Sequence, residues 1–190
     1  MQKNTKELIS STFIKLAEEK PFDKITIKDI VTECNINRNT FYYYYSDVYD
    51  LLEEIFKKEM YVIIETHNET GAWMEGFLKV ANIAYNHKKF IRNICNSRSY
   101  DYFENYMFRA CHHIIVDFVT LNADDRDVPA EDIEFIATFY EHGLVGTISA
   151  WFKSGMKTEP IELVGQLWLV LGNIKFSLRR SEKRKRELEE

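Results

Sequence analysis

Glycine and proline are scarce in this sequence, which contains 7 Gly and 3 Pro among 190 residues. Folds built from short strands and many turns need both residue types, so their scarcity favours long continuous helices. The sequence also lacks a signal peptide, and it lacks an apolar run near the length of about 18 residues that a membrane span needs. The scarcity of glycine and proline predicts an all-α protein, and the few, widely spaced cysteines described next predict the reducing cytoplasm.

Cysteine is sparse as well. The three cysteines, Cys34, Cys95 and Cys111, form neither a CxxC pair nor a Cys/His cluster with zinc-site spacing. His112 and His113 are adjacent, and adjacent side chains on a helix point about 100° apart, so they do not suit one metal ion. Paired carboxylates in a recognisable site, an activated nucleophile and a phosphate-binding loop are also missing. The sequence therefore predicts no metal, no cofactor and no enzyme activity.

Positive charge is not in surplus, because the formal net charge is −5. The first 46 residues carry seven Lys or Arg against six Asp or Glu. A nucleic-acid site in this part must therefore depend on where individual cations lie, and not on a strong overall field. Hydrophobic residues make up 45% of the chain, which is enough for a folded core.

Helix signals dominate the N-terminal part. Apolar residues recur at helical spacing between residues 5 and 20, and Pro21 ends this first helix. Thr26 and Asp29 then have the spacing of a capping box, which predicts the start of a second, short helix.

A tight turn and a third helix follow. Asn35 suits the turn because Asn tolerates the left-handed conformation, and Asn37 suits the N-cap of a helix over about 38–44. Two short helices joined by a tight turn and braced by a longer helix form a helix-turn-helix.

Longer helical patterns fill the rest of the sequence. Gly155 is placed to end one helix and Pro160 to begin the next. The predicted organisation is a three-helix head over 1–46, a helical body over 47–180 and a frayed, charged tail over 181–190. The predicted body helices span about 47–66, 72–86, 88–96, 99–121, 130–154 and 160–180.

Three stretches of the N-terminal part, Thr26–Val31, Cys34–Tyr45 and Asp50–Leu52, resemble the head of the TetR repressor family. The capping Thr, the turn, the Thr-aromatic-Tyr of the third helix and the first Leu of the fourth agree in register. The resemblance implies an all-α fold of about nine helices, with a helix-turn-helix head and a C-terminal helical bundle. It also implies a DNA-binding transcriptional repressor that binds a palindromic double-stranded operator as a homodimer and is released by a small-molecule effector.

By this resemblance the third helix enters the major groove. Lys28, Arg38 and Asn39 match positions that reach base edges, and Asn37 belongs to the same surface. The chemistry agrees, because Arg and Lys reach guanine acceptors and Asn pairs with adenine. The predicted phosphate contacts come from hydroxyl-bearing residues, which are Thr26, Thr40, Tyr42, Tyr43 and Tyr44.

Four consecutive tyrosines end this stretch at positions 42–45. Four neighbours on a helix point in all directions, so they cannot all be core residues. Tyr45 is predicted to be the buried one and to pack against Phe41. Two residues depart from the family pattern: Val48 stands where a phosphate-contacting Lys is common, and Tyr44 replaces the usual His. These departures predict weaker or differently placed phosphate contacts.

Aromatic residues are frequent in the predicted body. Core packing explains each of them alone, and the resemblance adds a ligand cavity between helices as an alternative. The candidates for effector contact are Trp73, Phe77, Phe103, Tyr106 and Tyr140. The last two long helices, in which Gly143 and Gly146 permit close approach, are predicted to dock against a second copy. The candidate interface residues, which also suit an intrachain core, are Leu144, Ile148, Trp151, Leu167, Leu171 and Ile174.

The helix over 47–66 belongs to both head and body, so it is predicted to transmit the effector signal. Its predicted contacts with the head come from Tyr49, Leu52 and Phe56, and those with the body from Val62 and Ile63. A second hypothesis from another functional class stays open, namely a regulator-shaped adaptor whose C-terminal domain binds a protein partner. Val48 and the nearly neutral head are the observations that favour it.

Overall fold

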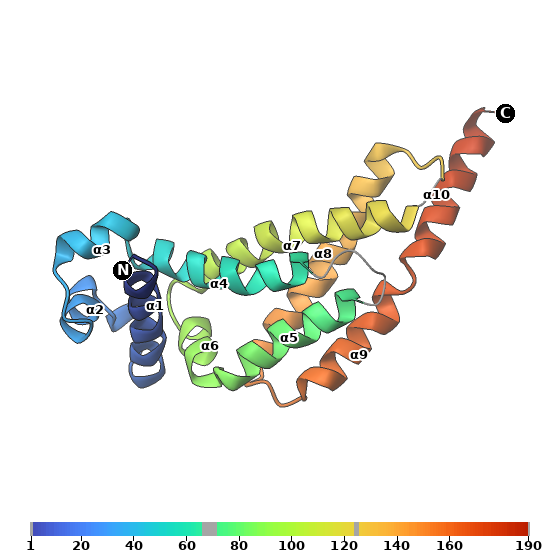
Figure 1. Cartoon of the computed structure of the whole chain (residues 1–190). Helices are drawn as coiled ribbons and strands as arrows, with labels where there is room; N and C mark the ends of the chain where they lie inside the picture. The colour runs from blue at the N-terminus through green and yellow to red at the C-terminus, as the bar shows by residue number, and fades with distance from the viewer. Residues whose placement is uncertain (1, 66–71, 124–125, 190) are drawn as a thin grey trace. The chain divides into compact units, whose positions relative to one another are not determined.

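The computed structural model describes the backbone of residues 2–65, 72–123 and 126–189, and the side chains of 5–58, 73–123 and 126–189. Within these ranges every regular element is a helix, which confirms the predicted all-α class (Figure 1). Val62 and Ile63 lie outside the described side chains. The elements are α1 Gln2–Glu19, the 3-10 turn η1 Phe22–Lys24, α2 Ile27–Glu33, α3 Arg38–Tyr44, α4 Val48–Glu65, α5 Ala72–Asn86, α6 Lys88–Cys95, α7 Tyr100–Ala123, α8 Ala130–Lys153, α9 Pro160–Leu171 and α10 Ile174–Glu189.

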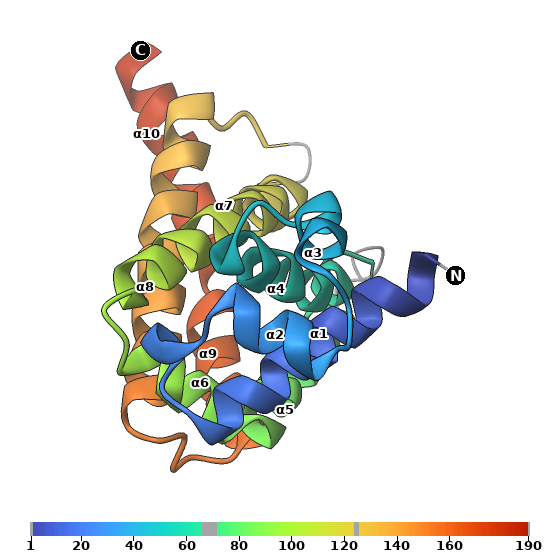
Figure 2. The same ribbon diagram turned by 90° about the vertical axis from the view of Figure 1, so that its left-hand side faces the viewer.

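The chain divides into two compact units. Unit 1 comprises Met1–Phe103 and Phe152–Met156, and unit 2 comprises Glu104–Trp151 and Lys157–Glu190. In unit 1, α1 packs against α2 and α6, α2 against α3, and α4 against α5 (Figure 2). The helix-turn-helix therefore shares one compact unit with the three helices that follow it.

The apolar face predicted for α1 forms the core of the head. Ile9, Phe13 and Ala17 are fully buried, and the Phe13 ring meets the rings of Phe22 and Phe90 edge-on at 6.0 Å each. Burying one such side chain contributes about 1.5–3 kcal/mol. Helices of seven residues are too short to be stable alone, so α2 and α3 depend on this packing.

Polar contacts fasten α6 and the segment after it to the head. The Asn93 side-chain amide donates to the Ala17 carbonyl oxygen at 2.7 Å, where the last turn of α1 leaves its carbonyl groups without helical partners. The Arg98 backbone N–H donates to the Asp23 carboxylate at 3.0 Å. The end of α1 is thereby held on two sides.

Unit 2 contains most of α7 and α8, together with α9 and α10. Phe118 of α7 packs edge-on against Trp168 of α9 with ring centroids 6.2 Å apart. His112 of α7 approaches the buried Glu141 carboxylate of α8 with its Nδ1 at 2.8 Å, which pairs a charge that would otherwise be buried alone.

The C-terminal end differs from its prediction in two ways. The helix predicted over 160–180 is two helices, because α9 ends before Gly172 and α10 begins at Ile174. The prediction of a frayed tail is wrong, since α10 continues to Glu189. Its cations find acidic partners outside the helix: Arg184 pairs with Asp132, and Lys185 pairs with Asp127.

By length and apolar composition alone, the stretch Pro160–Glu189 could cross a membrane. One window of 18 residues has a mean hydropathy of 1.2, and 28% of that window is buried. A single such stretch is weak evidence for a span, because core helices of soluble proteins share this length and composition. Its low burial marks an exposed apolar surface.

Candidate DNA-binding interface

The second helix begins with the predicted capping box. The Thr26 hydroxyl accepts a hydrogen bond from the Asp29 backbone N–H at 3.2 Å, and the Asp29 carboxylate accepts one from the Thr26 backbone N–H at 2.8 Å. Lys20 lies 2.9 Å from the same carboxylate. Hydrogen bonds from Lys20 and Thr26 hold the pKa of Asp29 well below its usual range. A negative charge on the exposed side of α2 is thereby neutralised locally.

The turn and the third helix also have the predicted local structure. Asn35 adopts the left-handed conformation with φ of 51°. The Asn37 side-chain oxygen accepts hydrogen bonds from the backbone N–H of Thr40 at 2.7 Å and from its hydroxyl at 3.0 Å. This N-cap uses the carbonyl end of the Asn37 amide, so its NH2 group remains available to a partner.

The tyrosine run separates into a buried and an exposed part. Tyr45 is 1% exposed and its ring lies 5.7 Å from the buried ring of Phe41, which confirms the predicted pairing. Tyr42 and Tyr43 are 52% and 71% exposed, and Tyr44 is half-buried. The rings and hydroxyls of Tyr42 and Tyr43 are therefore accessible to a partner.

Ion pairs neutralise most of the other lysines that the structure describes in the head. Lys6 pairs with Glu54 at 2.7 Å, and Lys15 pairs with Glu33 at 2.9 Å. Lys28 and Arg38, by contrast, form no ion pair with any residue that the structure describes, and both are exposed. The nearly neutral head thus has free positive charge beside α3.

The nine predicted contact residues all lie in the α2–α3 segment or at its caps. Seven are exposed, and Thr40 and Tyr44 are half-buried. Whether each one contacts DNA stays a prediction. The full set is Thr26, Lys28, Asn37, Arg38, Asn39, Thr40, Tyr42, Tyr43 and Tyr44.

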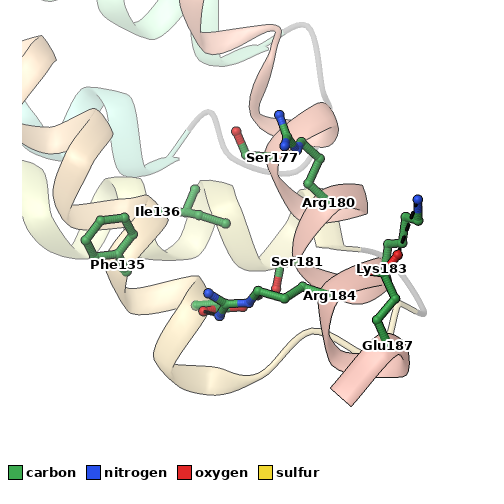
Figure 3. Close-up of a pocket in the computed structure, with 9 residues that line it drawn as sticks. Phe135, Ile136, Ser177, Arg180, Ser181, Lys183, Arg184 and Glu187 are labelled. Carbon is green, nitrogen blue, oxygen red and sulfur yellow. Dashed lines mark hydrogen bonds and ion pairs between the residues drawn. The ribbon is translucent and has the colours of Figure 1, made fainter. Parts of the chain in front are cut away.

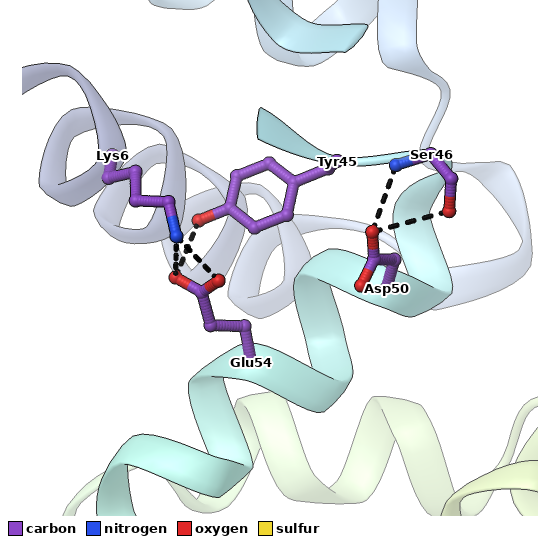
Figure 4. A network of polar contacts seen from close by, with 5 residues as sticks. All are labelled: Lys6, Tyr45, Ser46, Asp50 and Glu54. Atoms are coloured by element: carbon purple, nitrogen blue, oxygen red, sulfur yellow. Dashed lines mark hydrogen bonds and ion pairs between the residues drawn. The ribbon is translucent and has the colours of Figure 1, made fainter. Parts of the chain in front are cut away.

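A polar network that the sequence did not predict joins α3 to α4 (Figure 4). Both carboxylate oxygens of Glu54 accept from the Lys6 ammonium, and Glu54 Oε1 also accepts from the Tyr45 hydroxyl at 3.1 Å. Burial raises the pKa of Tyr45 to about 12. One turn earlier, the Asp50 carboxylate accepts from the Ser46 backbone N–H at 2.9 Å. The Tyr45–Glu54 spacing of nine residues across a helix break has no periodic signature in the sequence.

The α4 helix also contacts elements on its other side. The Tyr49 ring lies 5.8 Å from Phe22 in the head and 5.3 Å from Tyr102 in α7. The Phe56 ring lies 4.6 Å from that of Phe103. Tyr49 therefore bridges the head and α7, which extends its predicted role, while Leu52 is buried within unit 1.

The five aromatic residues predicted to contact an effector are all buried. Three of them belong to unit 1 and two to unit 2. Two cavities that the described residues form are lined by other side chains. The unit 1 residues are Trp73, Phe77 and Phe103, and the unit 2 residues are Tyr106 and Tyr140.

For the six predicted dimer residues, contact with a second copy stays a prediction. Leu144, Trp151, Leu171 and Ile174 are buried within the chain, while Ile148 and Leu167 are half-buried. Other positions on the same helices are exposed, and a Cβ atom added to any of the three glycines among them would meet nothing within 4 Å. We call these positions the α8–α9 apolar face, and they are Phe139, Gly143, Gly146, Ile161, Gly165 and Leu169.

Comparisons with known proteins agree with this architecture. A profile described as "Bacterial regulatory proteins, tetR family" matches residues 11–55, and one described as "Transcriptional regulator C-terminal region" matches residues 71–171. No curated protein matches the chain.

Two solved structures are similar in fold. The dihydroxyacetone kinase operon activator DhaS is 19% identical with a TM-score of 0.70, and the match covers 90% of this chain and 97% of DhaS. A TetR-family transcriptional regulator from Syntrophomonas wolfei is 16% identical with a TM-score of 0.53, and the match covers 93% and 97%. The helix-turn-helix, the helical C-terminal region and both profile matches together show that the chain belongs to the TetR family of transcriptional regulators.

Proposed function

We propose that this regulator binds a palindromic DNA operator as a homodimer, with residues 1–46 as the DNA-binding domain and the body from residue 47 as the dimerisation and effector-binding domain. The observation that carries the proposal is the free positive charge of Lys28 and Arg38 beside the exposed start of α3. A helix with donors and cations at its N-terminal end suits the major groove. The proposed site of DNA binding is the cytoplasm.

Base edges are read by a small part of this surface. Arg38 and Asn39 occupy the first turn of α3 and Lys28 the first turn of α2. Arg binds guanine O6 and N7 in a bidentate manner, and Asn does the same with adenine N6 and N7. Tyr42 and Tyr43 donate to phosphates, which fixes the position of the head without carrying sequence information.

Selection from a random duplex library tests the proposal. The expected product is an inverted repeat whose half-sites are about one helical turn apart or a multiple of it. The Arg38→Ala variant is expected to lose this enrichment, while Lys24→Ala, an exposed cation outside α2 and α3, is expected to retain it. Failure of the wild-type chain to enrich any sequence would favour the adaptor hypothesis instead.

The α8–α9 apolar face is the proposed dimer contact. Leu169 is 74% exposed and Ile161 62% exposed, and both are aliphatic side chains of α9. Gly143 and Gly146 follow Phe139 on the exposed side of α8 and allow a second helix to approach closely. A surface of this kind costs free energy in water, and burial against a second copy removes that cost.

A small apolar or aromatic effector is proposed to bind the body and to lower operator affinity. Its candidate contacts are Trp73, Phe77 and Phe103 within unit 1, and Tyr106 and Tyr140 within unit 2. Binding and release are linked, so an effector that weakens DNA binding by some factor is itself bound more weakly by that factor when DNA is present. The test is a titration in which fluorescence of Trp73 and Trp151 and operator release are recorded together. A compound that binds tightly and leaves operator affinity unchanged would disprove the coupling.

Repression is the proposed direction of regulation, and a reporter gene behind the selected operator tests it. Deletion of the regulator is expected to raise expression. DhaS carries the name of an operon activator, so a fall in expression on deletion would assign activation to this chain as well.

A further inference from the structure

A groove of about 430 Å³ lies between the first turns of α8 and the middle of α10, within unit 2 (Figure 3). This volume falls within the range of about 300–1,000 Å³ that is typical of small-molecule sites. Phe135 and Ile136 line it from α8. None of its lining residues belongs to the aromatic set proposed for the effector, so it is a separate site.

Charge within the groove is not balanced. Three cations and two carboxylates line it, which leaves one net positive charge. Arg184 pairs with Asp132, and Lys183 pairs with Glu187 at 3.4 Å. The remaining cation, Arg180, has no acidic partner in the described part of the chain, and its guanidinium lies over the Phe176 ring at 5.8 Å.

A hydroxyl donor lies beside this guanidinium. Ser177 precedes Arg180 by three residues, so the two side chains lie on one face of α10, and Figure 3 shows both at the same end of the groove. Unlike Ser181, whose hydroxyl donates to Asp132, Ser177 makes no side-chain hydrogen bond with the residues described. Together they present a planar guanidinium and a hydroxyl to one incoming acceptor.

The opposite wall is apolar. The Phe135 ring is 73% exposed, and Ile136 is buried beside it. A groove lined by an exposed aromatic ring and by an arginine without an acidic partner suits a ligand that is apolar at one end and anionic at the other.

We propose that this groove binds a small amphipathic carboxylate, whose carboxylate group is held by Arg180 and Ser177 and whose apolar body lies against Phe135. Arg and carboxylate form paired, charge-assisted hydrogen bonds, which explains why the site selects an anion over a neutral molecule of the same shape. All of its lining residues belong to α8 and α10, so its test does not require the operator.

The probes are 2-naphthoate and its uncharged amide, 2-naphthamide, titrated into the full-length ¹⁵N-labelled chain at low salt. We expect 2-naphthoate to shift the backbone resonances around Ser177 and Arg180, and 2-naphthamide to bind about tenfold more weakly. Arg180→Gln is expected to weaken 2-naphthoate about tenfold. The matched control is Arg179→Gln, an exposed arginine on the same helix outside the groove, which is expected to change affinity less than about twofold.

Three results would overturn the proposal. Equal losses in Arg179→Gln and Arg180→Gln would show that the cations of α10 act only as a diffuse field. Equal affinity for naphthoate and naphthamide, or no binding of either, would remove the carboxylate site. Tighter binding of an acidic peptide such as hexaglutamate, with shifts along all of α10, would assign the surface to a protein partner. Unchanged thermal unfolding of both variants shows that the fold is intact.

Discussion

The buried hydroxyl of Tyr45 donates a hydrogen bond to Glu54 across 3.1 Å, and this contact joins the residue that ends α3 to the middle of α4. Lys6 of α1 binds the same carboxylate. The neighbouring Glu53 accepts from the Tyr102 hydroxyl of α7 at 3.1 Å. Consecutive residues of α4 therefore connect the end of α3 on one side and α7 on the other.

Tyr45→Phe removes the hydroxyl and leaves the ring in place. The expected loss is about 0.5–1.5 kcal/mol in the free energy of unfolding, as for a typical hydrogen bond. Glu54→Gln and the double variant complete a mutant cycle, because residues in one network do not act additively. Tyr42→Phe, an exposed tyrosine of the same run, is the control and should leave stability unchanged in denaturant titrations.

The pKa of Tyr45, raised from 10.0 to about 12, makes stability depend on alkaline pH. Between these values the unfolded chain has lost the phenol proton and the folded chain has kept it. Stability contributed by this group is therefore complete below pH 10 and falls as pH rises toward 12. Wild type should lose stability across this window faster than Tyr45→Phe, and parallel curves for the two proteins would contradict the assignment.

The lowered pKa of Asp29 predicts a loss of stability at acid pH. The group stabilises the fold above its ordinary pKa of 3.8, and this contribution is lost as pH falls below that value toward the lowered pKa. Asp29→Asn should reduce the stability at neutral pH and flatten the acid dependence. Glu7→Gln, an exposed acid on α1, is the control. Helix content followed by circular dichroism from pH 7 to 2 measures both effects.

Lys28→Ala and Tyr42→Phe should affect DNA binding differently. Loss of Lys28 removes a groove contact, so it should alter sequence preference as well as affinity, by about 1–3 kcal/mol. Loss of the Tyr42 hydroxyl should weaken all sequences alike, because phosphate contacts carry no sequence information. Fluorescence anisotropy with the selected operator and with base-substituted operators separates the two. If Lys28→Ala changed neither affinity nor preference, Lys28 would not be a base contact.

Gly146→Leu should weaken the dimer while stabilising the helix that carries it. A Cβ at Gly146 meets nothing within 4 Å in the chain, and Gly in a helix costs up to about 1 kcal/mol relative to Ala. Sedimentation should show monomers, and thermal unfolding at low protein concentration should not fall. Lys79→Leu, which adds the same side chain to the exposed side of α5, controls for added hydrophobicity. A stable dimer of the Gly146→Leu variant would place the interface elsewhere.

Local sequence alone determined where several helices begin and end. The capping box at Thr26, the left-handed turn at Asn35, the N-cap at Asn37 and the end of α8 before Gly155 all follow from interactions within five residues. Such interactions depend on backbone geometry that every chain shares, so they can be predicted from residue types and spacing.

Tertiary structure decided which apolar residues face inward and which polar groups meet. By sequence, Leu144 and Leu171 suit a dimer interface. In the structure they are buried within the chain, whereas Phe139 and Leu169 are exposed. At the charged end of α10, Arg184 and Lys185 pair with Asp132 and Asp127, which lie about fifty residues earlier in the sequence. A helical pattern specifies one apolar face but not its neighbour, and an ion pair between distant residues depends on how the whole chain packs.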